Sequence, residues 1–165
     1  MRRRVYAREI YSLRNRTLLF LDETGFNLHT SCHYGYSPIS SDAVKNVPGN
    51  RGKNLSLVAL ISMRNILSYN LIEGACNGEN FMQFLQKSFD ENCFNNNPIV
   101  IMDNVRFHHR EDIKSWFSEE EIQIKYLPPF SPALNPIEEV FSMLKSRYAN
   151  VRPEARTTSQ LKTNI

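Results

Sequence analysis

Short apolar runs separated by polar turns dominate the hydrophobic pattern of the chain. They predict strands over residues 17–22, 54–63, 66–73, 98–103 and 122–126, with one further short strand near 34–37 in a turn-rich stretch. Apolar residues at helical spacing predict helices over 77–94, 110–117 and 135–149. In the last of these, Asn135 is expected to cap the helix and Pro136 to occupy its first position.

The order of these elements indicates the fold class. Consecutive strands come first, and helices and strands alternate after them. This order predicts an α/β fold, with a mixed sheet and helices on its faces. We divide the chain into a basic N-terminal segment (1–16), a folded domain (17–149) and a basic C-terminal tail (150–165). The first segment has weak helical periodicity, so we expect a frayed helix or the tail of an upstream segment.

Composition excludes several classes of protein. The chain has 165 residues, of which 41% are hydrophobic and 22% are charged, which suits one globular domain with a core. No apolar run approaches the roughly 20 residues of a membrane span, and no apolar core follows the charged start. We therefore expect neither a membrane segment nor export. Three separate cysteines, with no Cys-x-x-Cys pair, exclude a disulfide framework and a four-cysteine zinc site.

Basic residues gather at both ends of the chain. Residues 1–16 carry six arginines and one glutamate, and residues 145–165 carry five basic residues and one glutamate. The part between them is net acidic. Basic ends around an acidic centre are typical of a protein that binds a polyanion and holds a cation, although ordinary surface scatter produces the same distribution.

Two of the predicted strands are of the buried type and end in aspartate, at Asp22 and Asp103. Ligands bind at strand ends in sheets covered by helices, so these carboxylates converge if the two strands are neighbours. Glu138 and Glu139 follow in the first turn of the last predicted helix, whereas Glu23 points away from Asp22 on a strand. Carboxylates without a Cys or His cluster favour Mg²⁺ or Mn²⁺, and two such ions about 4 Å apart support phosphoryl transfer. A single Asp at a strand end is more often structural, so the hypothesis depends on the combination.

Four stretches of the chain carry a resemblance to a known family. They are FLDET at 20–24, PGNRGKNLSL at 48–57, IMDNVRFH at 101–108 and YLPPFSPALNPIE at 126–138. Together they resemble the catalytic domain of the Tc1/mariner–IS630 superfamily of DDE transposases, over roughly residues 17–149. The 34 residues between Asp103 and Glu138 resemble the branch whose third acid is Glu at this separation.

This resemblance implies an RNase H-like fold, a mixed five-stranded sheet flanked by helices. It implies that Asp22, Asp103 and Glu138 are the catalytic residues and the ligands of two Mg²⁺ or Mn²⁺ ions. Such enzymes hydrolyse phosphodiester bonds at transposon ends and join the 3′ hydroxyl to target DNA, with TA targets favoured. DNA is then the expected partner, a homodimer is a candidate assembly, and the compartment is the nucleus in a eukaryote or the cytoplasm or nucleoid in a bacterium.

The chain departs from the family pattern at three places. Ala133 stands where the family often has Asp, and residues 39–41 lack the usual Gly and basic residue, which affects a DNA contact rather than the metal ligands. In the family, helix-turn-helix modules that recognise transposon ends precede the catalytic domain, and little sequence precedes Asp22 here. We therefore expect a catalytic fragment, a degenerate copy or a domesticated remnant.

Three polar residues near the acids are secondary candidates for the site. Asn104 adjoins Asp103 and is placed to orient its carboxylate. His108 has no partner at zinc spacing and is a candidate for a phosphate contact beside the metals. Glu139 is the lesser alternative to Glu138, since it lies about 100° around the helix.

Basic residues in two places are candidates for contacts with the DNA backbone. Arg51 and Lys53 lie in a glycine-containing turn, and Lys145 and Arg147 lie on the last predicted helix. The turn lacks the glycine spacing and the Ser or Thr of a phosphate-binding loop, so we expect no nucleotide cofactor.

Two alternatives to the transposase hypothesis stay open at this stage. One is a non-catalytic DNA-binding or assembly module derived from a transposase. The other is an RNase H-type nuclease that cleaves RNA–DNA hybrids, which shares the metal chemistry but has no support in the Pro-Pro-Phe-Ser-Pro context at 128–132.

Overall fold

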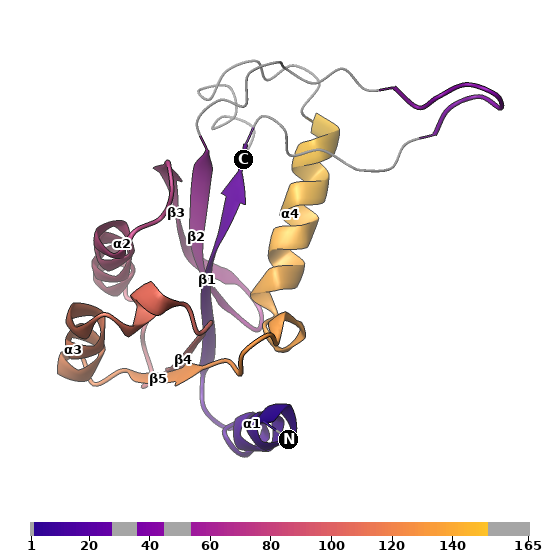
Figure 1. Ribbon diagram of the computed structural model, residues 1–165. Coiled ribbons are helices and arrows are strands. Elements are labelled where there is room, and N and C mark those ends of the chain that lie inside the picture. The colour runs from indigo at the N-terminus through magenta and orange to yellow at the C-terminus, as the bar shows by residue number, and fades with distance from the viewer. Residues whose placement is uncertain (1, 28–35, 45–53, 152–165) are drawn as a thin grey trace.

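The structure, a computed structural model, describes residues 2–27, 36–44 and 54–151 (Figure 1). Within these residues, five strands form one sheet in the order β3-β2-β1-β4-β5. The strands are β1 (Leu18–Phe26), β2 (Leu55–Ser62), β3 (Ile66–Glu73), β4 (Ile99–Met102) and β5 (Gln123–Tyr126). The helices are α1 (Arg2–Ser12), α2 (Gly78–Asp90), α3 (Glu111–Glu119) and α4 (Ile137–Val151), with short 3-10 helices at Arg106–His109 and Pro132–Leu134.

The sheet is mixed, as the order of the elements predicts. β1, β2 and β3 form an antiparallel meander, whereas β4 pairs in parallel with β1, and β5 pairs in parallel with β4. The parallel pairs arise because α2 connects β3 to β4 and α3 connects β4 to β5. As a result, β1 and β4 are direct neighbours that run in the same direction.

Helices cover both faces of the sheet, and Figure 1 shows α4 on one side with α2 and α3 on the other. α1 and α4 share a hydrophobic core with Phe20, Phe26 and Ile101, and α2 and α3 share a second core with Leu19 and Leu21. Alternate side chains of a strand point to opposite faces. The central strands are apolar at nearly every position because they supply both cores.

The predicted end of the first strand at Asp22 is wrong. β1 continues to Phe26 because β2 pairs with it as far as Phe26↔Leu55. Its pairing with β4, in contrast, stops at Leu21↔Met102. Asp22 therefore lies at the point where β1 loses one of its two neighbouring strands.

Two helix boundaries and one predicted strand also differ from expectation. α2 ends at Asp90 rather than 94, and the chain turns at Asn92, whose φ is 59°. α4 begins at Ile137, so Pro136 lies in the preceding turn and not in the helix. Of the predicted strand near 34–37, residues 36 and 37 are not in a strand, and the rest lies outside the described residues.

The basic N-terminal segment is more ordered than its sequence predicts. α1 places Tyr6, only 8% exposed, and Ile10 in the same hydrophobic core as α4. An ion pair of 3.0 Å between Glu9 and Lys125 joins α1 to β5. None of the helices in the described residues is long and apolar enough to cross a membrane.

Candidate active site

Asp22 and Asp103 occupy equivalent places on neighbouring strands. They directly follow Leu21 and Met102, the last pair of residues that joins β1 to β4. The expectation that these two strands are neighbours is confirmed. Because the strands run in parallel, both acids lie at the same edge of the pair.

A cavity of about 370 Å³ opens beside these two acids. Asp22, Asp103 and Glu138 all line it, and Glu138 comes from the first turn of α4. The remaining lining residues are Asn104, Val105, Leu127, Pro128, Pro129, Phe130, Ser131, Pro132 and Asn135. Glu139 is not among them, so the cavity favours Glu138 over its neighbour as the third acid.

The carboxyl group of Asp22 is held by two donors and is almost completely buried. Its Oδ1 accepts a hydrogen bond of 2.8 Å from the backbone N–H of Glu23, and its Oδ2 accepts one of 2.8 Å from Nδ2 of Asn135. Burial raises the pKa of Asp22 to about 7, the Glu23 N–H bond opposes the rise, and the charges of Asp103, Glu23 and Glu138 add to it. The cavity thus concentrates negative charge, which a bound cation would relieve.

Asn135 does not cap α4 as the sequence predicts. Its side chain is 3% exposed and donates to Asp22, and its Oδ1 has no hydrogen-bond partner among the described residues. Sequence reasoning therefore missed a residue that fixes the first acid. An Asn before Pro at a helix start has an ordinary structural explanation, and only the fold shows that its amide reaches β1.

His108 connects Asp103 to the opposite face of the sheet. Its ring is fully buried, with Nδ1 2.8 Å from Oδ1 of Asp103 and Nε2 3.4 Å from Oε2 of Glu23. Neither Nε2 nor Oε2 has a hydrogen-bond partner, so the second contact is an ion pair without hydrogen-bond geometry. Burial alone would lower the pKa of His108, but the two carboxylates raise it to about 9. The ring is therefore a cation at neutral pH, and Phe81 and Phe107 pack against it.

This position changes the interpretation of His108. The sequence suggests a contact with phosphate, but a fully buried ring has no surface on which to form one. Glu23 faces away from Asp22, as expected, yet it is the second partner of the ring. Asn104 lines the cavity, and its Oδ1 contacts Nε2 of His109 rather than Asp103.

The chemistry of the cavity suits a divalent cation. Three carboxylates are hard oxygen donors of the kind that Mg²⁺ and Mn²⁺ prefer. Within residues 2–27, 36–44 and 54–151, however, no three His, Cys, Asp or Glu side chains are arranged to hold one ion. Asp103 is turned toward His108, and Glu138 is exposed. Shared ligation by the three acids therefore stays a prediction.

Only part of the predicted DNA-binding set can be placed. Lys145 is half-buried on α4, with Nζ 5.9 Å from the centre of the Phe26 ring, and it lies two helical turns beyond Glu138 on the same side. Arg147 is exposed, and helical geometry puts it on the opposite side of α4 from Glu138. Arg51 and Lys53 lie outside the described residues.

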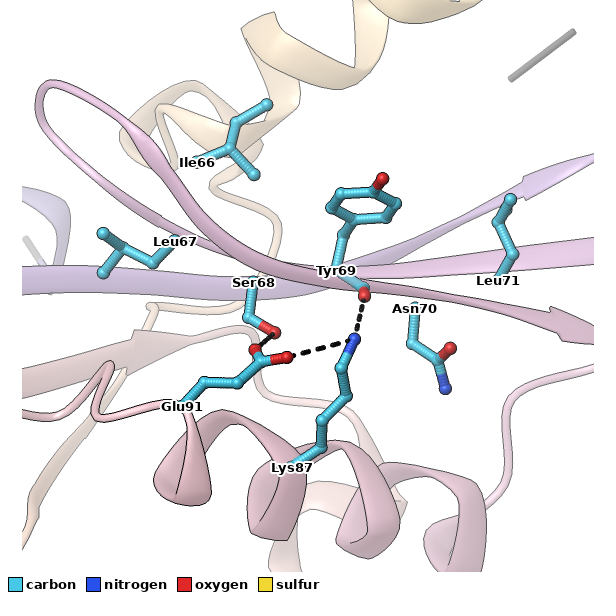
Figure 2. A pocket seen from close by; sticks show the side chains of 8 residues that line it. All are labelled: Ile66, Leu67, Ser68, Tyr69, Asn70, Leu71, Lys87 and Glu91. Atoms are coloured by element: carbon cyan, nitrogen blue, oxygen red, sulfur yellow. Dashed lines mark hydrogen bonds and ion pairs between the residues drawn. The ribbon is translucent and has the colours of Figure 1, made fainter.

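A larger cavity, of about 670 Å³, lies at the edge strand β3, away from the acids (Figure 2). Its charged residues already have partners, since Lys87 donates to the backbone oxygen of Tyr69 and pairs with Glu91 at 3.7 Å, and Glu91 accepts from Ser68. It offers one carboxylate where the smaller cavity offers three. Chemistry rather than size therefore identifies the smaller cavity as the candidate active site.

Comparison with known protein families assigns the chain to a class of nucleases. The family of DDE superfamily endonucleases matches the chain over residues 17–162. This match covers most of the chain, and the chain belongs to that family. No curated protein matches its sequence.

Solved structures of the Mos1 mariner transposase share the fold. A pre-cleavage Mos1 transpososome is 13% identical, with a TM-score of 0.72 over 96% of this chain and 50% of that chain. The Mos1 strand transfer complex is 15% identical, with a TM-score of 0.71 over 96% of this chain and 48% of that chain. The Mos1 catalytic domain is 13% identical, with a TM-score of 0.65 over 96% of this chain and 72% of that chain.

These likenesses establish the fold, which is the RNase H-like fold that the resemblance implies. The chain spans about half the length of the Mos1 chains in the two complexes. Membership of the DDE endonucleases and the fold class expected from the sequence are thus confirmed. The branch with 34 residues between the second and third acids stays a prediction, and the activity of a whole transposase is a matter for proposal.

Proposed function

We propose that the chain is the catalytic domain of a DDE transposase, which hydrolyses DNA phosphodiester bonds and transfers DNA strands with the help of divalent cations. The observation that carries this proposal is the shared cavity of Asp22, Asp103 and Glu138 at the ends of two parallel strands. Membership of the endonuclease family and the fold of the mariner catalytic domain support it.

Asp22, Asp103 and Glu138 would hold the cations, for which we propose two Mg²⁺ or Mn²⁺ ions. When bound, such ions activate the attacking water or hydroxyl and stabilise the leaving oxygen. The chain itself positions the ligands: the Glu23 N–H and Asn135 fix Asp22. A cavity lined by three carboxylates repels a phosphodiester unless cations offset its charge, so phosphate chemistry here needs the metal.

His108 is proposed to act behind Asp103. Its cationic ring holds Oδ1 of Asp103 at 2.8 Å. It thereby restricts the rotation of the second acid, as partners behind metal-bound residues commonly do.

DNA is the proposed substrate. Lys145, on the same side of α4 as Glu138, is a candidate for a contact with it, and Arg147, Arg51 and Lys53 are further candidates. Solved Mos1 structures include a paired-end complex with Mn and a strand transfer complex. By analogy, transposon ends and TA targets are the proposed DNA, and a homodimer that pairs two ends is the proposed assembly.

A nicking assay tests the proposal. The full chain is incubated with supercoiled plasmid and Mn²⁺, and the conversion to open circles is followed. We expect Glu138→Gln to lower the rate by about 1,000-fold, equal to about 4 kcal/mol of lost transition-state stabilisation, because it removes a charged ligand. The matched control is Glu139→Gln, which changes the adjacent residue outside the cavity and should keep the wild-type rate.

Three results would count against the proposal. If Glu138→Gln and the wild type nick the plasmid at the same rate, the three acids are not the catalytic site. If the wild type binds DNA but does not nick it, the non-catalytic module is favoured. Faster cleavage of an RNA–DNA hybrid than of duplex DNA would favour an RNase H-type nuclease.

A further inference from the structure

Phe130 combines two features that are unfavourable for a folded protein. Its side chain is 92% exposed, and its backbone has a φ of 54°. A positive φ is uncommon for any residue with a side chain and is an outlier for a bulky one. The other non-glycine residues with positive φ in the described parts of the chain are Ser40, Asn92, Asn96, Asn97 and Glu121, all of them polar. Strained backbone of this kind, when other parts of a structure maintain it, points to function.

The surrounding structure holds Phe130 in this conformation. The guanidinium of Arg3, on α1, donates from Nη2 to the backbone oxygen of Phe130 and from Nε to Oγ of Ser131 at 2.9 Å. Oγ of Ser131 in turn donates to the backbone oxygen of Pro129 at 3.1 Å. Proline rings at 128, 129 and 132 restrict the same loop. The aromatic ring is therefore presented outward from a braced loop.

The exposed ring of Phe130 lies at the cavity of the three acids. Phe130 lines the same cavity as Asp22, Asp103 and Glu138, and among the described residues that line it no other is aromatic. A nucleobase lies next to every phosphodiester bond, so DNA bound at the acids brings bases to the mouth of this cavity. An exposed aromatic face binds an unstacked base of any sequence, because every base has a π-face.

We propose that Phe130 stacks on an unpaired nucleobase next to the phosphodiester bound at the acid cavity. This inference rests on the proposed function, because it takes DNA to be the substrate. Stacking on Phe130 holds the base out of the duplex, so that the flanking phosphate can enter the cavity. The ring adds affinity for frayed or overhanging DNA and little affinity for a blunt, fully paired duplex.

The test measures stacking directly. The full chain is titrated into two DNA probes without divalent cation: a duplex with an unpaired 2-aminopurine in a short 3′ overhang, and the same duplex made blunt. We expect the wild type and Phe130→Trp to quench 2-aminopurine fluorescence. Phe130→Leu, which keeps an apolar side chain without a π-face, should lose the quenching and bind the overhang probe about 10-fold more weakly. Its affinity for the blunt probe should change less than twofold.

A second variant separates stacking from folding. Asn tolerates a positive φ better than Phe does, and the exposed ring contributes no buried area. Phe130→Asn should therefore have an equal or higher unfolding temperature and still lose the quenching. A structural role for Phe130 would instead lower the unfolding temperature. Tyr69→Leu changes an aromatic residue, 60% exposed on β3, and should leave both DNA measurements unchanged.

The outcomes distinguish this inference from the proposed function. If Phe130→Leu still quenches the overhang probe, stacking is refuted, even when Glu138→Gln abolishes plasmid nicking. If Phe130→Leu changes only the oligomeric state, the ring is a protein contact and the inference is again wrong. If the wild type neither nicks plasmid nor binds either probe, the proposed function fails first.

Discussion

Asp22 and Glu23 are consecutive residues of β1, and their side chains lie on opposite faces of the sheet. One face is open to a cavity, and the other is buried. Asp22 faces the open cavity with Glu138, is held by neutral donors and stays close to two other negative charges. Glu23 faces the closed side, where the buried cation His108 lies between it and Asp103. Among the described residues, the carboxylate on one face has no counter-ion, whereas on the other face two carboxylates share one buried cation.

This difference shows how one strand serves both binding and stability. The cavity side keeps unneutralised carboxylates, which is costly for the protein alone and useful for a cation. On the His108 side, one cation contacts two carboxylates, and its 2.8 Å contact with Asp103 holds the second acid in position. The following predictions test this contrast, from the largest expected effect to the smallest.

The closed face should be the more important for stability. His108→Ala leaves two partly buried carboxylates without their cation and opens a cavity beside Phe81. We expect the free energy of unfolding to fall by about 3 kcal/mol. Urea denaturation measures the change, and His108→Gln, similar in size but neutral, should lose less. A loss below about 0.5 kcal/mol would mean that the network does not stabilise the fold.

The contribution of His108 to the free energy of unfolding should also depend on pH. Folding raises the pKa of His108 from 6.5 to about 9, so the native state binds this proton more tightly than the unfolded chain. The contribution is complete below pH 6.5 and is lost as the pH rises through 9. The decline in stability above pH 7 should therefore be smaller in His108→Gln than in the wild type.

The open face should behave in the opposite way. Folding raises the pKa of Asp22 from 3.8 to about 7, so its contribution to stability is lost as the pH rises from about 4 through 7. Without divalent cations, Asp22→Asn should be more stable than the wild type by about 2 kcal/mol at pH 8 and no more stable at pH 4. Asn135 can turn its amide so that its unpaired Oδ1 accepts a bond from the new side chain.

Thermal unfolding at the two pH values, with and without Mn²⁺, makes this measurement. Added Mn²⁺ should raise the unfolding temperature of the wild type by mass action and leave that of Asp22→Asn unchanged. If Mn²⁺ does not change the unfolding temperature of the wild type, or if Asp22→Asn is less stable at pH 8, Asp22 is not a metal ligand whose negative charge destabilises the metal-free protein.

The smallest effect concerns the basic residues of α4. Lys145 lies on the same side of the helix as Glu138, and Arg147 lies on the opposite side. Lys145→Ala should weaken duplex binding by about threefold and reduce the slope of log affinity against log salt by about 1. Arg147→Ala is the matched control and should change neither value by as much. Equal losses in the two variants would mean that DNA does not approach from the side of the acids.

Local pattern was sufficient to predict most of the fold. Short apolar runs indicated each strand of the sheet, and the order of elements indicated its mixed topology. The end of β1 was missed because an acid after an apolar run looks the same whether the strand stops or continues beside β2. That distinction depends on a partner strand far away in the sequence.

The acids of the candidate site were visible in the sequence, but their supporting residues were not. Asp22, Asp103 and Glu138 stand in recognisable motifs, and the fold brings them to one cavity. The bond from Asn135 to Asp22 and the contact of Glu23 with His108 depend on which elements pack together. Short local patterns carry no information about such contacts.

The antiparallel meander and the acid cavity also differ in how much of the chain must be synthesised before each can form. The meander of β1, β2 and β3 comes from one continuous stretch, whereas Asp22 and Asn135 are separated by 113 positions. Distant contacts form late, because the chain between them loses entropy when it closes. A ribosome-bound chain that has emerged only as far as β3 already contains its first acid but lacks the other two. The three acids can therefore share one cavity only after α4 has been synthesised and has packed against β1.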